Sequence, residues 1–222
     1  KAHGITVYNA GGVYSAPMAE FVVGGILQLY KESKFFAENQ AAHRWEKHRG
    51  LRELSGKTAC IIGTGSVGSA IARRLRAFDV QTVGINRSGH SAAEFDQTQP
   101  TCRLDDLLPL ADLVICAMPL TVETAGLFDS VRLAKIKPGA VFVNVARGKV
   151  ADQQALAEAL QSGQLFGAVL DVFEEEPLPR SSPLWDMEQV ILTPHNSFVG
   201  EHNGERLFKC IKEHLYELSK EC

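Results

Sequence analysis

Short apolar runs recur along the chain, and most of the segments between them carry apolar residues at helical spacing. The runs predict strands over residues 58–62, 80–85, 112–117, 140–145, 166–170 and 189–192. The intervening segments predict a helix after the first run, a short helix capped by Asp105, and helices over 130–136 and 152–162. Because strands and helices alternate and the strands are apolar almost throughout, we expect an α/β protein with a doubly wound parallel sheet.

The segment ahead of these units predicts a short strand over residues 4–9 and then a long helix from Pro17 toward Phe36. Ser15 can cap this helix, and proline suits its first turn. Gly24-Gly25 lies within its apolar stripe, and each glycine costs about 1 kcal/mol relative to alanine, so another backbone is expected to pack closely there. We therefore expect the helix to form a homodimer contact, with a contact inside the chain as the alternative.

One glycine-rich turn organises the sequence. The stretch from Thr58 to Ala70 has the pattern of a buried strand that turns on glycines and continues as a helix, with the turn at Gly63-Thr64-Gly65-Ser66-Val67-Gly68. This spacing is the dinucleotide fingerprint. Gly63 permits the tight turn, Gly65 lets the backbone approach a pyrophosphate, and Gly68 lets the helix pack closely on the strand. The sequence predicts a Rossmann-type dinucleotide-binding domain, with a merely structural glycine turn as the alternative.

Composition narrows the class of protein further. The chain has 222 residues, 45% of them hydrophobic, and a net charge of −3, which fits neither a disordered chain nor a nucleic-acid binder. Its five cysteines have no CxxC spacing, so neither a disulfide framework nor a zinc site is expected, and Cys60 and Cys116 fall in predicted strands as packing thiols. No apolar run approaches the roughly 18 residues of a membrane span, and no signal peptide is apparent, so we expect a cytoplasmic protein.

Polar residues follow four of the predicted strands, at 119–121, 146–148, 171–176 and 194–196. Taken singly, Arg147 could be a surface arginine, Glu176 the end of a solvated acidic run, and His195 an ordinary loop histidine. Because the carboxyl ends of parallel strands meet at one edge of a sheet, these side chains are expected to converge beside the dinucleotide. A proton donor, a carboxylate that tunes it and a cation that holds an anionic substrate are what a carbonyl reduction requires.

Five motifs in this order resemble the D-isomer-specific 2-hydroxyacid dehydrogenase family, which includes phosphoglycerate dehydrogenases, hydroxypyruvate reductases and formate dehydrogenases. The motifs are the glycine turn, Pro119-Leu120-Thr121-Val122-Glu123-Thr124, Asn144-Val145-Ala146-Arg147-Gly148, Leu170-Asp171-Val172-Phe173-Glu174-Glu175-Glu176-Pro177, and Leu184-Trp185-Asp186 leading to Thr193-Pro194-His195. The resemblance covers nearly the whole chain.

The resemblance implies roles for particular residues. Arg147 binds the carboxylate and carbonyl of a 2-keto or 2-hydroxy acid, His195 is the acid/base, Glu176 pairs with His195, and Asp171 contacts the nicotinamide end. No metal is expected. The residues expected to bind the cofactor are Gly63, Thr64, Gly65, Ser66, Val67, Gly68, Asn86, Arg87, Ser88, Pro119, Thr124, Val145, Ala146 and Asp171.

Two positions depart from the family pattern. Asn86, followed by Arg87 and Ser88, stands at the end of the second strand, where the family usually has an acidic residue. A carboxylate there would bind the ribose hydroxyls of NAD and repel a 2′-phosphate, whereas Arg87 and Ser88 suit a phosphate. We therefore expect NADP(H) in preference to NAD(H), although Arg87 could instead point to solvent. The second departure, Phe198 where small residues are common, bears on pocket size.

The family resemblance implies three parts. Residues 1–14 would be the trailing edge of a substrate domain whose larger part lies upstream, residues 15–197 the dinucleotide-binding domain with the long dimerisation helix, and residues 198–222 a C-terminal helix returning toward the substrate domain. A nucleotide-sensing interaction protein, resembling the C-terminal-binding-protein corepressors, is the alternative function. Arg147, Glu176 and His195 argue against a further alternative, an inactive nucleotide-binding fold.

Overall fold

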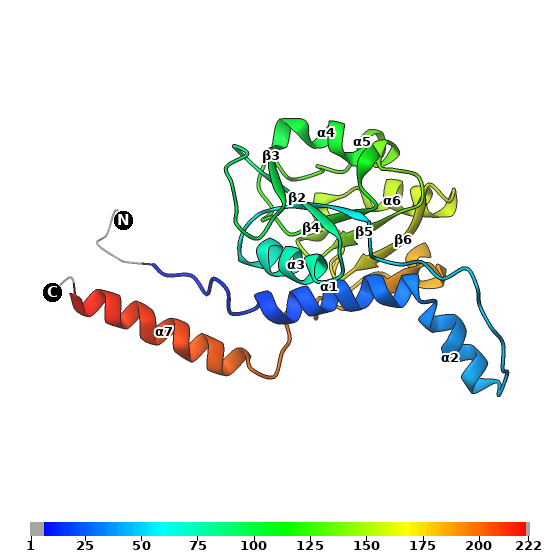
Figure 1. Ribbon diagram of the computed structural model, residues 1–222, viewed down its shortest axis with the longest axis horizontal. Coiled ribbons are helices and arrows are strands. Elements are labelled where there is room, and N and C mark those ends of the chain that lie inside the picture. Colours follow the sequence, from blue (N-terminus) through cyan, green and yellow to red (C-terminus); the bar gives the residue numbers. More distant parts are fainter. Residues whose placement is uncertain (1–6, 221–222) are drawn as a thin grey trace.

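A parallel sheet of seven strands forms the centre of the computed structural model, which describes residues 7–220. The strand order is β3-β2-β1-β4-β5-β6-β7, and every neighbouring pair runs parallel. Figure 1 labels strands β2 to β6 of this sheet. The strands are β1 Thr58–Ile62, β2 Gln81–Asn86, β3 Gln97–Pro100, β4 Leu113–Cys116, β5 Ala140–Asn144, β6 Leu165–Leu170 and β7 Val190–Leu192. This architecture confirms the predicted doubly wound α/β fold.

Helices cover both faces of the sheet. The helices are α1 Ser15–Tyr30, α2 Ser33–Ala41, α3 Ser66–Arg76, α4 Leu104–Leu107, α5 Ser130–Lys135, α6 Gln153–Gln161 and α7 Asn203–Lys220. Alternate strand residues point to opposite faces, so Ile61 packs in the layer of α1 and α3, whereas Ile62 packs in the layer of α4, α5 and α6. Burial raises the pKa of the Cys60 thiol to about 12. Burial, followed by the charge of Cys60, also raises the pKa of Cys116 well above its ordinary value.

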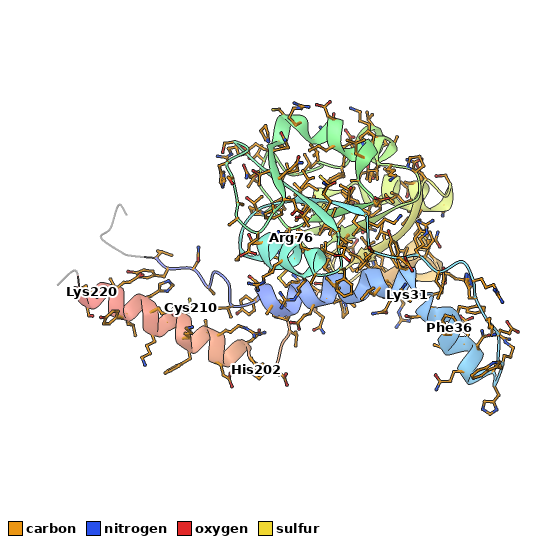
Figure 2. All side chains as sticks on the ribbon, viewed as in Figure 1. Lys31, Phe36, Arg76, His202, Cys210 and Lys220 are labelled. Carbon is orange, nitrogen blue, oxygen red and sulfur yellow. The ribbon has the colours of Figure 1, made fainter. Side chains whose placement is uncertain are left out.

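The first long helix is shorter than predicted. It ends at Tyr30, whose carbonyl accepts the backbone N–H of Arg52, and the chain bends at Glu32, where φ is +50°, before α2 begins. Figure 2 shows Lys31 at the end of α1 and Phe36 beyond this bend. The predicted cap is also wrong. Ser15 is the first helical residue, its hydroxyl is buried without a partner, and no side chain caps the helix.

The two glycines of α1 face different surroundings. A Cβ added to Gly25 would lie 2.6 Å from Cγ1 of Val169 on β6, so this glycine fits the helix onto the sheet of the same chain. A Cβ on Gly24 would meet nothing within 4 Å. The sequence suggested that another backbone packs against the two glycines. The close neighbour of Gly25 is instead the side chain of Val169 in the same chain.

Three further elements differ from the sequence-based expectation. The polar segment after β2 contains an edge strand, β3, which lacks the apolar alternation that would have revealed it. Asp105 does not cap α4 but lies within it and accepts hydrogen bonds from Arg132 and Lys135. Residues 7–9 of the strand expected over 4–9 have no regular structure, and residues 4–6 lie outside the described part.

The last helix lies away from the sheet, beside the segment that leads into α1 (Figure 1). Arg206 Nε donates to the carbonyl of Val13 at 2.7 Å, and the rings of Tyr8 and His214 stack with centroids 4.4 Å apart. None of the residues of α7 is buried. The expected three-part division, with α7 returning toward a substrate domain, stays a prediction.

Candidate active site

The loops at the carboxyl ends of the strands carry the predicted site residues, and the parallel sheet brings these loops to one edge. Two regions can be distinguished along this edge. We call the loops after β1 and β2, residues 63–68 and 86–90, the nucleotide end. We call the loops after β5, β6 and β7, residues 145–148, 171–177 and 193–198, the catalytic end.

The glycine turn has the shape that a dinucleotide requires. Gly63 has a φ of +107°, and a Cβ on Gly68 would collide with the carbonyl oxygen of Gly63, so both positions need glycine. Gly65 is the N-cap of α3, no side chain caps this helix, and an added Cβ would meet nothing within 4 Å. The first N–H groups of α3 therefore face an open cradle, which fits the pyrophosphate of a dinucleotide.

The side chain of Asn86 closes the turn after β2. Its Oδ1 accepts the N–H of Gly89 at 2.7 Å, while its Nδ2 donates to the carbonyl of His90 at 2.9 Å and to Oγ1 of Thr64 at 3.2 Å. Asn86 thereby ties this turn to the glycine turn. Arg87 and Ser88 project from it into solvent, and Ser88 Oγ lies 3.1 Å from Nδ1 of His90, a residue that the sequence analysis did not include.

The loops after β4 and β5 are closed by their own side chains. Thr124 Oγ1 donates to the carbonyl of Pro119 at 2.8 Å, and Asn144 Nδ2 donates to the carbonyl of Arg147 at 3.0 Å. Val145 and Ala146 are buried beneath the edge, whereas Arg147 is exposed. A Cβ on Gly148 would collide with the backbone of Phe173, so the arginine loop lies directly against the loop after β6.

Glu176 and His195 form a hydrogen-bonded pair at the catalytic end. His195 Nδ1 lies 2.9 Å from Oε2 of Glu176, and Oε1 of the same carboxylate accepts the N–H of Phe173 at 3.0 Å. Both side chains are more than a third exposed, so they face the open edge of the sheet. The Glu176-Pro177 peptide bond is cis. The pairing that the family resemblance implies is therefore present in the geometry.

The carboxyl of Glu176 remains charged over a wide pH range. Burial acts to raise its pKa, but the hydrogen bonds from His195 and Phe173, together with the charges of His195 and Arg147, outweigh it and lower the pKa. The influence of Arg147 indicates that its guanidinium lies within electrostatic range of the pair. A charged carboxylate on Nδ1 fixes the orientation of the imidazole.

Asp171 is fully buried, at 0% exposure, beneath the same loops. Its Oδ1 accepts the hydroxyl of Thr193 at 2.6 Å and the N–H of Asn196 at 2.7 Å, and its Oδ2 accepts the N–H of Ser197 at 3.0 Å. Sequence reasoning missed Thr193 and Ser197 as partners of this carboxylate. Only their position after β7, the strand next to β6, could have indicated them. A direct contact between Asp171 and a nicotinamide stays a prediction.

An apolar cavity of about 640 Å³ lies beside the pair, lined by His195, Glu176 and the side chains of Leu178, Trp185 and Leu192. The rings of Phe198 and His195 are nearly perpendicular, at 84°, with centroids 6.2 Å apart. Within residues 7–220, no group of three or more His, Cys, Asp or Glu side chains is placed to hold a metal ion. No helix in the same described range has the length and hydropathy that crossing a bilayer requires.

Together, the parallel sheet and the glycine turn define a Rossmann-type dinucleotide-binding domain. Residues 23–197 match the model of the D-isomer specific 2-hydroxyacid dehydrogenase family, NAD binding domain. The chain belongs to this family and carries its NAD(P)-binding domain.

Several relatives extend the likeness across nearly the whole chain. Glyoxylate reductase of Thermofilum pendens is 39% identical over 224 residues, which cover 98% of this chain and 66% of the relative. Among solved structures, a D-isomer specific 2-hydroxyacid dehydrogenase family protein from Aeromonas salmonicida has a TM-score of 0.84 and 35% identity, over 96% of this chain and 67% of its own.

The NADPH-dependent glyoxylate/hydroxypyruvate reductase of Sinorhizobium meliloti, solved with NADP and sulfate, has a TM-score of 0.82 and 29% identity, over 94% of this chain and 66% of its own. The chain spans about two thirds of the length of the curated relatives that it matches.

Proposed function

We propose that the protein containing this chain is an oxidoreductase that transfers a hydride between a nicotinamide cofactor and C2 of a 2-keto or 2-hydroxy acid. The observation that carries the proposal is the pair of His195 and Glu176, whose Nδ1 and Oε2 atoms are 2.9 Å apart, on the same sheet edge as the glycine turn. A bound nicotinamide supplies the hydride in reduction and accepts it in oxidation.

His195 handles the proton in this mechanism. Because Nδ1 faces Glu176, Nε2 is free to donate a proton to the substrate carbonyl oxygen as that oxygen becomes negative. Glu176 holds the ring in place and stabilises the imidazolium before the transfer. In the oxidative direction, the neutral ring removes the proton from the substrate hydroxyl, so reduction is favoured at lower pH and oxidation at higher pH.

Arg147 provides the cation that an anionic substrate requires. Its guanidinium is exposed at the catalytic end, and its loop packs against the loop that carries Glu176 through the contact of Gly148 with Phe173. A forked guanidinium can bind the substrate carboxylate with two hydrogen bonds and turn the carbonyl toward His195.

NADP(H) is the proposed preferred cofactor. Asn86 puts no negative charge at the end of β2, and its side chain holds the turn from which Arg87 and Ser88 project. An arginine and a hydroxyl there suit a 2′-phosphate. Arg87 is also close enough to Glu123, in the loop after β4, to contribute to the lowered pKa of that carboxyl, after the larger effect of the Thr121 hydroxyl.

A substrate screen on the full-length protein tests the proposed reaction. Glyoxylate, hydroxypyruvate, phenylpyruvate, 2-ketoisocaproate and phosphohydroxypyruvate would each be offered with NADPH and with NADH, and oxidation of the cofactor would be followed by absorbance. We expect turnover of at least one 2-keto acid. If a folded protein that binds NADPH turned over none of these, the proposal would be wrong, and the corepressor-like sensing function would take its place.

A homodimer is proposed through the outer side of α1, where a Cβ on Gly24 would meet nothing within 4 Å and a second helix could approach closely. The inner side of the helix is already used, because Gly25 packs against Val169 of the same chain. Light scattering at micromolar concentration should give twice the mass of the chain, and a monomer would contradict the dimer.

A cytoplasmic location also stays a prediction.

A further inference from the structure

We propose that Asp171 is a positioning residue for His195, acting through the loop of residues 193–197. The inference rests on the proposed function, because it assigns His195 its role as acid/base. It differs from the contact with the nicotinamide that the family resemblance implies, because Asp171 here acts on the protein loop.

The hydrogen bonds of Asp171 lie on both sides of His195. Before the histidine, the hydroxyl of Thr193 donates to Oδ1 at 2.6 Å, and after it the N–H groups of Asn196 and Ser197 donate to Oδ1 and Oδ2 at 2.7 and 3.0 Å. The backbone carbonyl of Asp171 accepts the N–H of His195 itself at 2.8 Å. One residue at the end of β6 therefore holds the loop after β7 at four points.

The loop needs this support because of its backbone conformation. His195 has a φ of +51°, in the left-handed region that residues with a side chain rarely adopt. Such a conformation persists when the surrounding structure fixes it. The bonds to Asp171 fix the backbone on each side, and the ring is thereby directed to Glu176, whose own carboxylate is held by Phe173.

Because the carboxylate of Asp171 is buried, it depends on the hydrogen bonds that the histidine loop donates to it. Asp171 is 0% exposed, and each of its three carboxylate bonds is donated by residues 193–197. A buried carboxylate stripped of these donors would be costly, so the charge ties the loop down more strongly than a neutral acceptor would. Asp171 thus couples the position of the histidine to the core of the sheet.

Two substitutions with a matched control test the assignment in the full-length protein. Asp171→Asn replaces one acceptor oxygen by a donor, and Thr193→Val removes the hydroxyl without changing the size of the side chain, whereas Thr193→Ser keeps the hydroxyl. A displacement of a reacting group by about 1 Å can cost about 100-fold in rate. We expect kcat to fall by about 10- to 100-fold in Asp171→Asn and by a smaller factor in Thr193→Val. Thr193→Ser, which keeps the hydroxyl, should retain most of the wild-type kcat.

Binding and ring orientation are measured separately from turnover. The Kd for NADPH, from fluorescence titration, should change by less than about threefold in the Thr193 variants, because the loop does not form the nucleotide end. The NMR signals of the His195 ring should titrate at lower pH in Thr193→Val than in Thr193→Ser, because a loosened ring loses part of its contact with Glu176. This signal tests the positioning even in a protein without turnover, so it is independent of the proposed reaction.

Three results would overturn the inference. One is that Thr193→Val matches Thr193→Ser in both kcat and the ring titration. Another is that Asp171→Asn keeps the wild-type kcat at saturating NADPH while its Kd for NADPH rises tenfold or more, which would place Asp171 on the cofactor. If Asp171→Asn does not fold, the comparison of the two Thr193 variants decides alone, and equal ring titrations would then reject the positioning role.

Discussion

The nucleotide end and the catalytic end of the site are built differently. At the nucleotide end, Arg87 and Ser88 are exposed neighbours in sequence, and the turn that presents them is closed by one partly buried amide, Asn86. At the catalytic end, the working side chains come from three separate loops, and the histidine loop is fixed by Asp171, a fully buried carboxylate. The residues proposed to set the cofactor preference therefore lie at the surface, whereas the proposed acid/base, His195, is tied to the core.

The largest expected effect is at the catalytic end. His195→Ala removes the proton donor, so kcat should fall by about 100- to 10,000-fold while the Kd for NADPH stays within about threefold of the wild-type value. Steady-state absorbance at saturating substrates and fluorescence titration on the full-length protein measure kcat and the Kd, respectively. His202→Ala, which removes another exposed imidazole, is the matched control and should keep wild-type kinetics. Wild-type turnover in His195→Ala would contradict the role of this residue.

A smaller loss should follow from removing Arg147, the proposed substrate-binding cation. Arg147→Ala should lower kcat/KM for a 2-keto acid by about 10- to 150-fold, because a hydrogen bond to a charged group contributes about 1.5–3 kcal/mol. The preference for NADPH over NADH should not change, since that preference belongs to the nucleotide end. Lys149→Ala removes a nearby exposed cation and should have little effect. Equal kinetics in the two variants would contradict the role of Arg147.

At the nucleotide end, the opposite pattern is expected. Arg87→Ala should lower the NADPH to NADH ratio of kcat/KM by about 10- to 150-fold, for loss of one charged contact to the 2′-phosphate. The KM for the 2-keto acid should stay close to the wild-type value. Arg73→Ala, on the exposed side of α3, provides the control. A wild type that favours NADH, or a ratio that Arg87→Ala leaves unmoved, would remove the proposed preference and leave Arg87 as a solvent-exposed residue.

The difference between the nucleotide end and the catalytic end also determines how much of the site could be predicted from the sequence. The glycine turn and the buried strands have local signals, because backbone sterics and burial determine the residue types there, and both were predicted correctly. The pairing of His195 with Glu176 also agrees with the structure, although it was implied by the family resemblance. The four hydrogen bonds between Asp171 and the loop of residues 193–197 join residues far apart in sequence, and no local sequence pattern predicts them.

Other differences have equally specific causes. Helix α1 stops at Tyr30 because its carbonyl meets the N–H of Arg52, a residue from a segment that periodicity cannot place. Strand β3 is a polar edge strand, so neither an apolar run nor alternation marks it. Asp105 is a residue type that often caps a helix, but its carboxylate accepts hydrogen bonds from Arg132 and Lys135 and lies within the helix. Tertiary contacts decide each of these cases.

The smallest effect on activity is expected from the opposite edge of the sheet, at the amino ends of the strands, where a substitution should change stability only. Asp112, which precedes β4, accepts hydrogen bonds from the N–H of Thr58 at 3.0 Å and from Nζ of Lys137 at 2.8 Å. Burial acts to raise its pKa, but these two bonds, together with the charges of Lys137 and Lys57, outweigh it and hold the pKa below the ordinary value of 3.8. Like Asp171, this carboxylate ties loops together, but no predicted site residue is among its partners.

Asp112→Asn should therefore lower the free energy of unfolding by about 1–3 kcal/mol at pH 7 without changing NADPH binding. Because the pKa of Asp112 is lower in the folded state, its stabilisation is complete above about pH 3.8 and is lost as the pH falls through the folded value below that. Urea unfolding at pH 7, 5 and 3 should show equal differences at the first two and a smaller one at the third. Asp106→Asn, which removes an exposed carboxylate paired with Arg103, should change the free energy of unfolding by less than about 1 kcal/mol throughout. A difference for Asp112→Asn that is as large at pH 3 as at pH 7 would show that packing, and not the charge of this carboxylate, holds the amino edge together.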